Sequence, residues 1–276
     1  MRFLYKIATV SIVSSYMVAS FYPFSILALP VASTGNISID ARMHPSERKQ
    51  TASVWDVSGI DVSRIEKGRK LIALTFDDAP ASTLDPILKV FLDFNTAHAN
   101  APATATVFCN GKNITPSTHA SLQTACTIGF ELGNHTQHHH NLVCLSPAEI
   151  QAEIQQTDTA LKRFDGKSVH LLRTPYGNVN EAVRESARTP IIDWFIDTLD
   201  WTGRSADEIY QMVWESKFSG CIVLMHDGYP NTVEALTRLL PDLYQDGYQA
   251  VTVSQMAKAH NCPLKIGSVY TRARKK

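Results

Sequence analysis

Seven short apolar runs alternate with longer stretches that carry helix signals, and this alternation constrains the fold of the 276-residue chain more than any other feature. The runs cover residues 71–76, 103–108, 129–132, 169–172, 191–196, 221–225 and 250–253. Strands that alternate with helices predict parallel pairing through right-handed crossovers. Because the runs are mostly apolar, we expect a sheet that is buried on both faces.

The intervals between the runs contain helix boundaries. Ser146 and Glu149 have the spacing of a capping box, with a proline between them at the first helical position. Apolar residues then recur on one helical face as far as Gly166, which predicts the end of that helix. The apolar stripe of a later helix contains Pro241, which we expect to kink or shorten it.

Two architectures fit this order of elements, a closed (β/α) barrel and an open doubly wound sheet, and periodicity does not decide between them. Both place chemistry at the carboxyl ends of the strands. Five of the runs are followed by polar clusters, which we expect to meet along one rim: Asp77 with Asp78, the stretch from His135 to His140, Arg173, Asp197 with Asp200, and His226 with Asp227.

The first cluster is a pair of adjacent carboxylates, Asp77 and Asp78. Two neighbouring carboxylates are costly at a strand end unless they share a cation or a proton. Successive side chains of a strand point in different directions, so we expect separate roles, one binding a metal and the other moving protons. An N-cap of the following helix is the alternative use of an aspartate at this position.

The second cluster is rich in histidine. His135 and His139 are four residues apart, and on a helical turn this spacing places both imidazoles on one face. His135 paired with His138 is an alternative. Together with Asp78, two imidazoles form a donor set that leaves coordination positions open for water and substrate. Zn²⁺ is the first choice of divalent metal, and Co²⁺, Mn²⁺, Ni²⁺ and Fe²⁺ suit the same ligands.

The remaining clusters each allow a catalytic and a structural interpretation. His226 suits a general acid or a metal ligand, or it is a hydrogen-bonded histidine of the rim. Asp200 is positioned to orient it, or is a turn residue. Arg173 is a candidate partner of Asp77, against the alternative of a surface salt bridge of little energetic value.

The amino-terminal 33 residues indicate export. Arg2 and Lys6 are the only charges in this segment, an apolar stretch follows to about residue 29, and small residues precede a cleavage point after Ser33. Residues 1–33 therefore resemble a signal peptide or, because the stretch is long, an uncleaved membrane anchor. Both place the rest of the chain in the periplasm or outside the cell. Residues 34–66 form a polar lead-in segment, and residues 67–276 form the domain that carries the clusters.

Charge and cysteine content limit the partners. With 26 basic and 26 acidic residues the formal charge is zero, which gives no electrostatic basis for binding nucleic acid. Membrane contact is expected only through an uncleaved amino-terminal segment. Five cysteines cannot all pair within one chain, and Cys221 lies in an apolar run that suits a small core residue. The oligomeric state and disulfide pairing are not predicted.

Taken in order, the clusters resemble the polysaccharide deacetylase family, which is carbohydrate esterase family 4 or the NodB-homology domain. The match covers residues from about 70 to 260 and consists of five motifs: Thr75-Phe-Asp-Asp78, His135-Thr-x-x-His139, Arg173-x-Pro-Tyr-Gly177, Asp197-x-x-Asp-Trp201 and Leu224-x-His226. The resemblance implies an α/β fold, a distorted (β/α) barrel with seven strands.

The resemblance also implies a set of roles around the metal. Asp78, His135 and His139 would hold the ion. Asp77 would be the general base that deprotonates the metal-bound water. Arg173 would orient Asp77 and balance its charge.

For the substrate side, the resemblance implies that His226 is the general acid that protonates the leaving nitrogen, paired with Asp200. The main-chain N–H of Tyr176 would help to hold the oxyanion. Tyr176, Trp194 and Leu224 would line a pocket for the acetyl methyl group.

Three positions depart from the family pattern without removing a catalytic group: Ala79 replaces a glycine, and Thr174 and His140 replace prolines.

The resemblance implies an activity, the metal-dependent removal of N-acetyl groups from chitin oligomers, peptidoglycan or poly-N-acetylglucosamine. The same catalytic groups could also remove O-acetyl groups from xylan. The rival interpretation is a glycan-binding protein of the same fold without turnover. A small-molecule amide hydrolase is disfavoured by the export signal.

Overall fold

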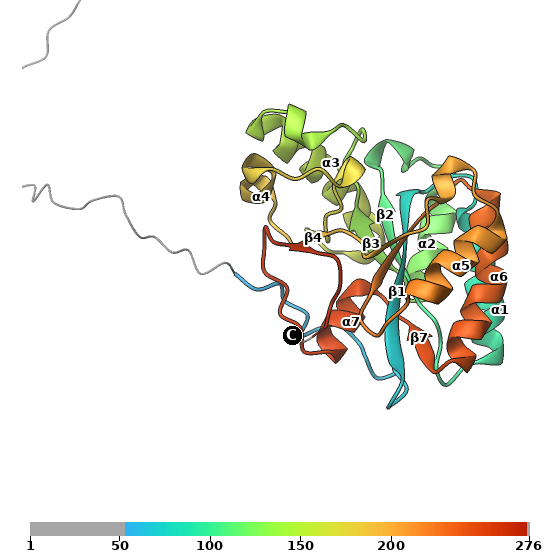
Figure 1. Cartoon of the computed structure of the whole chain (residues 1–276). Helices are drawn as coiled ribbons and strands as arrows, with labels where there is room; N and C mark the ends of the chain where they lie inside the picture. The colour runs from blue at the N-terminus through green and yellow to red at the C-terminus, as the bar shows by residue number, and fades with distance from the viewer. Residues whose placement is uncertain (1–52, 275–276) are drawn as a thin grey trace, which may run out of the picture. The chain divides into compact units, whose positions relative to one another are not determined.

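The computed structural model describes residues 53–274, and the predicted signal or anchor of residues 1–33 lies outside this part of the chain. Figure 1 shows strand β1 (Lys70–Ala79) at the centre, with helices α1 (Leu84–Ala97), α5 (Ala206–Ser216) and α6 (Pro230–Gln245) together on one side of it. Within residues 53–274, no helix combines the length and the apolar character needed to cross a bilayer.

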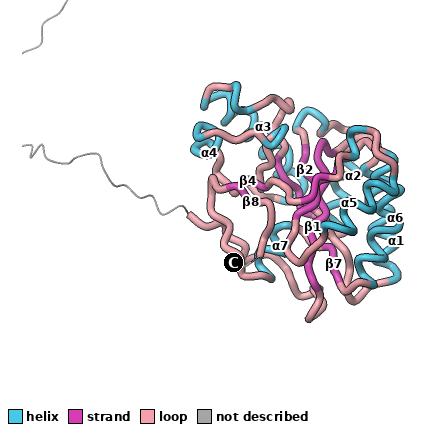
Figure 2. Tube along the Cα trace, viewed as in Figure 1, coloured by secondary structure: helices cyan, strands magenta, loops and turns pink. Residues whose placement is uncertain are grey.

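The central sheet has the hydrogen-bonded order β3-β2-β1-β6-β5, and β7 also pairs with β1. Every ladder between the named strands is parallel, as the alternation predicted. Figure 2 shows these strands at the core of the molecule. Their bounds are β2 (Thr106–Cys109), β3 (Glu131–Asn134), β5 (Ile196–Asp197), β6 (Ile222–His226) and β7 (Tyr248–Ala250).

The chain of strand pairing continues beyond β3. Single parallel bridges join Asn134 to Leu172 and Leu172 to Ile191, and they lead on to a two-stranded sheet of β4 (Ile191–Ile192) and β8 (Val269–Tyr270). The remaining helices are α2 (His119–Thr127), α3 (Pro147–Asp165), α4 (Glu181–Ser186) and α7 (Val253–Ala259). The predicted parallel α/β fold is therefore present, whereas the strand ladders of residues 53–274 do not by themselves form a closed seven-stranded ring.

Three of the seven predicted strands differ from the expectation; the run 250–253 contributes only Ala250 to β7, and α7 begins at Val253. The run 191–196 is divided into β4 and β5, and the run 169–172 contributes only the bridges at Leu172. Residues 193–195 link the two halves: the Asp193 N–H donates to Tyr270 on one side, and the Phe195 N–H donates to Ile222 on the other. This change of partner cannot be read from a single, mostly apolar run.

The predicted helix boundaries hold for α3, and Pro241 does not shorten α6. Ser146 and Glu149 form the capping box, and Gly166 caps the other end with a left-handed φ of 75° that only glycine adopts readily. Pro241 does not end its helix, which continues to Gln245. The apolar stripe of α6 stays buried across the proline, and this burial outweighs one missing hydrogen bond.

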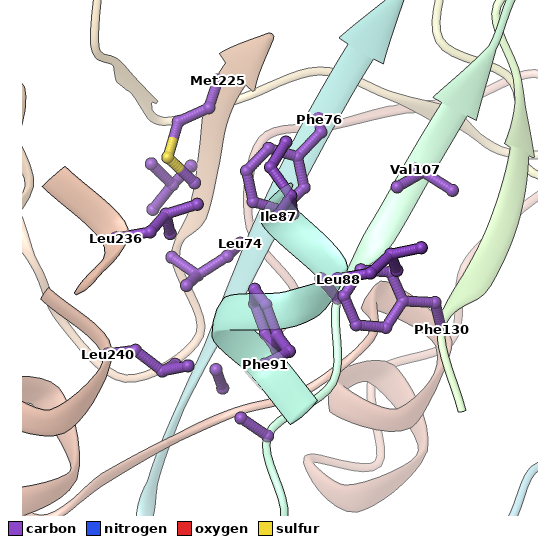
Figure 3. Packing of buried hydrophobic residues seen from close by; sticks show 14 of the residues in the cluster. Leu74, Phe76, Ile87, Leu88, Phe91, Val107, Phe130, Met225, Leu236 and Leu240 are labelled. Carbon is purple, nitrogen blue, oxygen red and sulfur yellow. The ribbon is translucent and has the colours of Figure 1, made fainter. Parts of the chain in front are cut away.

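The main core lies between β1 and the helices of the first side, and Figure 3 shows its packing. Leu74 and Phe76 of β1 point into this core, while Leu71 and Ala73 belong to a second buried cluster on the other face. Side chains alternate along a strand, so Thr75 and Asp77 share the face of Leu71 and Ala73. Strand β1 therefore directs the side chain of Asp77, near the end of the strand, inward.

The described part of the lead-in segment packs on this domain. The Trp55 N–H donates to Leu264 at 2.7 Å, and Ile65 packs against the second cluster. All five cysteines, which lie within residues 53–274, are free thiols. Cys221 is fully buried, as expected of a small core residue, and burial raises the pKa of its thiol to about 11.

Candidate metal centre and active site

Asp77 and Asp78 end strand β1 and point in different directions. Asp77 Oδ1 accepts a hydrogen bond from Arg173 Nη1 at 2.8 Å, whereas Asp78 Oδ1 accepts one from Asn110 Nδ2 at 2.7 Å. The divergence follows from the left-handed backbone of Asp78, which has φ 64°. Neither aspartate caps α1, whose N-cap position is Thr83. The separate environments predicted for the two carboxylates are present.

The two histidines of the second motif reach Asp78 from a loop. The Nε2 atoms of His135 and His139 lie 3.9 and 3.5 Å from Asp78 Oδ1. The expected helical turn is wrong: residues 135–141 are not helical, and Thr136 and His139 take left-handed φ values of 70° and 63°. These two residues fold the loop so that the imidazoles meet, with ring centroids 4.9 Å apart.

The hydrogen bonds around this cluster leave ligand atoms free. His135 Nδ1 lies 2.8 Å from the carbonyl oxygen of Arg173, which can only accept, so Nδ1 carries the proton and Nε2 carries a lone pair. Burial lowers the pKa of His139 and favours its neutral form. Asp78, His135 and His139 thus offer one carboxylate oxygen and two imidazole nitrogens within 4.8 Å of one another, a donor set that fits a divalent transition metal.

Arg173 is fully buried behind Asp77 and is not a surface residue. Its guanidinium donates to Thr75 Oγ1 at 2.7 Å, to Asp77 Oδ1 at 2.8 Å, and to the carbonyl oxygens of Ile192 at 2.8 Å and Asp193 at 3.2 Å. A buried guanidinium must be paired in this way, because an isolated charge in the interior is expensive. The arginine therefore fixes the position of Asp77 and pairs with its carboxylate.

His226 ends β6 directly beside Asp77, its register partner on β1. Its Nδ1 lies 2.7 Å from Asp200 Oδ1, and its main-chain N–H donates to Asp200 Oδ2 at 2.8 Å. Burial alone would lower the pKa of His226, but the hydrogen bond to Asp200 and the charges of Asp77, Asp200 and Asp78 outweigh it and raise that pKa. The imidazolium form is thus favoured next to the carboxylate of Asp77.

The three residues expected at the substrate side lie in different settings. Tyr176 is 64% exposed, has a left-handed φ of 63°, and packs edge-on against His139 with centroids 4.9 Å apart. The Trp194 ring lies against Gly177, where an added Cβ would come within 3.0 Å of it. Leu224 is buried in β6 opposite Thr75. The structure brings Tyr176 to His139 of the candidate metal cluster and Trp194 to the adjoining turn.

Three polar residues near the site were not assigned a role from the sequence, and two of them, Asn110 and Asp227, are buried. Asn110 orients Asp78, and it follows β2 just as the recognised clusters follow their strands. Asp227 accepts hydrogen bonds from the N–H groups of Ala81 and Thr83 at 2.5 and 2.9 Å, which ties the loop after β1 to the end of β6.

Asp193 is the third, and it lay hidden inside an apolar run. Its buried Oδ1 has no hydrogen-bond partner among residues 53–274. Burial raises the pKa of its carboxyl group, although the charge of Arg173 opposes this.

Comparison with known proteins accounts for this arrangement. Residues 64–190 match the family described as Polysaccharide deacetylase. A peptidoglycan-N-acetylglucosamine deacetylase of Bacillus cereus is 31% identical over 203 residues, which cover 70% of this chain and 91% of that protein. The chain belongs to the polysaccharide deacetylase family. This confirms the resemblance found in the sequence motifs.

Other members of the family are longer. Peptidoglycan-N-acetylglucosamine deacetylase PgdA of Listeria monocytogenes is 33% identical over 216 residues, 77% of this chain but only 44% of that protein. Among solved structures, peptidoglycan deacetylase PdaC of Bacillus subtilis matches with a TM-score of 0.65 at 30% identity, covering 71% of this chain and 94% of that one. A family 4 acetyl xylan esterase of Clostridium thermocellum in complex with a cobalt ion matches with a TM-score of 0.66 at 25% identity, covering 74% and 98%.

Proposed function

We propose that this member of the polysaccharide deacetylase family is an exported, metal-dependent hydrolase that removes N-acetyl groups from a glycan. One observation carries the proposal: two hydrogen-bonded pairs, Asp77 with Arg173 and His226 with Asp200, flank the cluster of two imidazoles and a carboxylate. A protein that only binds sugars needs neither Asp77 as a base nor His226 as an acid. Both are what amide hydrolysis by water requires, a base on one side and an acid on the other.

The metal and the base prepare the attack on the acetyl carbonyl. A divalent ion held by Asp78, His135 and His139 would polarise the carbonyl and lower the pKa of a water molecule. Asp77 takes the proton from the attacking water. Arg173 orients that carboxylate and balances its charge, because its guanidinium is buried and fixed by four hydrogen bonds. Water attacks directly, so no covalent enzyme intermediate is needed.

The acid completes the reaction. An amine leaves only when it is protonated, and His226 supplies the proton while Asp200 stabilises the imidazolium. The main-chain N–H of Tyr176 contributes a donor to the developing oxyanion, a contribution of about 3 kcal/mol for one preorganised donor. Trp194 and Leu224 line the position of the acetyl methyl group together with the Tyr176 side chain.

Peptidoglycan is the glycan we favour, because two of the relatives and one matching structure carry peptidoglycan deacetylase names. Chitin oligomers and poly-N-acetylglucosamine present the same acetamido group. O-acetyl groups of xylan are a further substrate class, supported by the acetyl xylan esterase match. Zn²⁺ is the proposed physiological ion, since two imidazoles and one carboxylate suit it well.

We also propose the domain plan and the barrel. Residues 1–33 export the chain as a signal peptide or anchor, residues 34–66 lead in, and residues 67–276 form the catalytic domain. Residues 193–195 hydrogen-bond to both halves of the structure, and this bridging supports closure of the sheet into a distorted barrel of seven strands.

Acetate release tests the proposal. The full chain is incubated with acetylated chito-oligosaccharides, peptidoglycan and acetylated xylan, with and without a chelator. We expect chelator-sensitive release that falls at least 100-fold in Asp77→Asn and in His226→Ala, while the exposed control Asp207→Asn stays at the wild-type rate. Glycan binding without release in the metal-loaded wild type would instead establish the rival interpretation, a binding protein of the same fold.

A further inference from the structure

A second group of metal-ligating side chains lies beside the first. His138 and His140 come from the active-site loop, and Glu153 comes from α3. Their ligand atoms lie within 4.8 Å of one another, as those of Asp78, His135 and His139 do. This second group shares no residue with the proposed catalytic site.

The spacing of the second group is close to that of a metal centre. The Nδ1 atoms of His138 and His140 lie 2.7 and 3.5 Å from Glu153 Oε1. Ligand atoms of a tetrahedral zinc site, with bonds of about 2.0–2.1 Å, lie roughly 3.3 Å apart. An ion would therefore need only a small widening of the gap between His138 and Glu153.

Burial and access also suit an ion. The Glu153 side chain is only 8% exposed, and its Oε2 accepts the main-chain N–H of His138 at 2.8 Å, which holds the carboxylate in place. The imidazoles of His138 and His140 are 48% and 59% exposed, so an ion can enter from solvent. The ammonium group of Lys112 lies next to His138, Glu153 and His140, and its Nζ donates to the main-chain carbonyl of His138 at 3.3 Å.

We propose that His138, His140 and Glu153 form a second site for a divalent transition-metal ion, with Zn²⁺ as its ion. Two imidazoles and one carboxylate leave a fourth position for water. Consecutive residues serve the two sites, since His139 faces Asp78 while its neighbours on both sides face Glu153. An ion at the second site would fasten to α3 the loop that presents His139.

Counting zinc in matched variants tests the second site directly. The full chain without a histidine tag is dialysed to equilibrium against Zn²⁺, and bound zinc is measured by mass spectrometry, with titration calorimetry for affinity. We expect two ions in the wild type, one in His140→Ala, one in Asp78→Asn, and none in the double variant. His119→Ala, an exposed histidine of α2, is the control and should retain two.

The second site and the proposed function fail in different ways. His140→Ala is informative because His140 makes no part of the loop anchor, which is the pair of hydrogen bonds between His138 and Glu153. A single ion in the wild type, two ions in His140→Ala, or no ion in a folded Asp78→Asn would overturn the second site. Absence of acetate release from a protein that binds two ions would overturn the deacetylase proposal alone.

Discussion

His226 makes two hydrogen bonds to the same partner, since its imidazole Nδ1 and its main-chain N–H both contact the carboxylate of Asp200, at 2.7 and 2.8 Å. Thr232 and the main-chain N–H of Trp201 donate to the same carboxylate. Asp200 is itself buried, so its charge acts on the imidazole with little screening by water. The pair links the end of β6 to the turn after β5 as well as tuning the histidine.

The pH profile should report this pair. Because the pKa of His226 is raised, the acid form persists above the usual histidine range, and kcat/KM should fall only as pH rises through that raised pKa. Asp200→Asn removes the charge that favours the imidazolium, so this basic limb should move to lower pH by roughly one unit. The measurement is acetate release from pH 5 to 10, with Asp207→Asn as a control that leaves the limb in place. An unshifted limb in Asp200→Asn would contradict the assignment of His226 as the acid.

Removal of the buried arginine should damage both rate and stability. Arg173→Met leaves Asp77 as an uncompensated buried charge, and we expect a loss of about 3–5 kcal/mol in the free energy of unfolding. Urea denaturation of the single variants Arg173→Met and Asp77→Leu and of the double variant measures their coupling. The double variant should recover part of the lost stability. Strictly additive losses would show that the pair is not coupled.

The residue behind Asp78 should control metal affinity. Asn110 Nδ2 orients the Asp78 carboxylate, so Asn110→Ala should weaken zinc binding at that site by about 10–100-fold. Asn113 is the matched control, since its Nδ2 donates at 3.1 Å to the main-chain oxygen of Asp78 and not to the ligand carboxylate. Competition with a chromogenic chelator gives both affinities. Equal losses in the two variants would argue against a specific effect on the ligand.

The loop after β1 should depend on Asp227. Asp227→Ala leaves the N–H groups of Ala81 and Thr83 and the Thr83 hydroxyl without their acceptor, and we expect a loss of about 2 kcal/mol or more. Thermal or urea unfolding measures it. Asp207→Ala, at an exposed carboxylate of α5, should change stability by less than about 0.5 kcal/mol.

Thiol reactivity should follow burial. Burial raises the pKa of Cys221 to about 11 and raises the pKa of Cys109 well above its usual value, whereas Cys144 is exposed. A thiol reagent at pH 8 should therefore modify Cys144 first in the native protein, and Cys109 and Cys221 only after unfolding. Peptide mapping after brief labelling distinguishes them. Rapid labelling of Cys221 in the folded chain would contradict its place in the core.

The sequence predicted the parallel sheet and the meeting of polar clusters at one rim because both follow from local patterns. Apolar runs mark strands, and polar residues after them mark strand ends. The conformation of the loop after β3 was not predictable in this way. Thr136 and His139 adopt left-handed φ values that non-glycine residues rarely take, so their residue types do not indicate this backbone conformation.

Long-range contacts account for the other misses. The division of the run 191–196 depends on which strands lie on either side of residues 193–195. The burial of Arg173 depends on groups nearly a hundred positions earlier in the chain, such as Thr75 and Asp77. Local propensity carries no information about the division of the run or the burial of the arginine. The family motifs identified Arg173 as a site residue but did not indicate that it is buried.

The hydrogen bonds of Arg173 have a consequence for interpreting relatives. The same guanidinium that serves Asp77 also holds Thr75, Ile192 and Asp193, so it fastens distant segments of the chain to one another. A descendant that had lost all chemistry would still unfold more easily without this arginine, and selection for folding would preserve it. Presence of the arginine is therefore a poor marker of a working enzyme, and survival of Asp77 and His226 is the better guide.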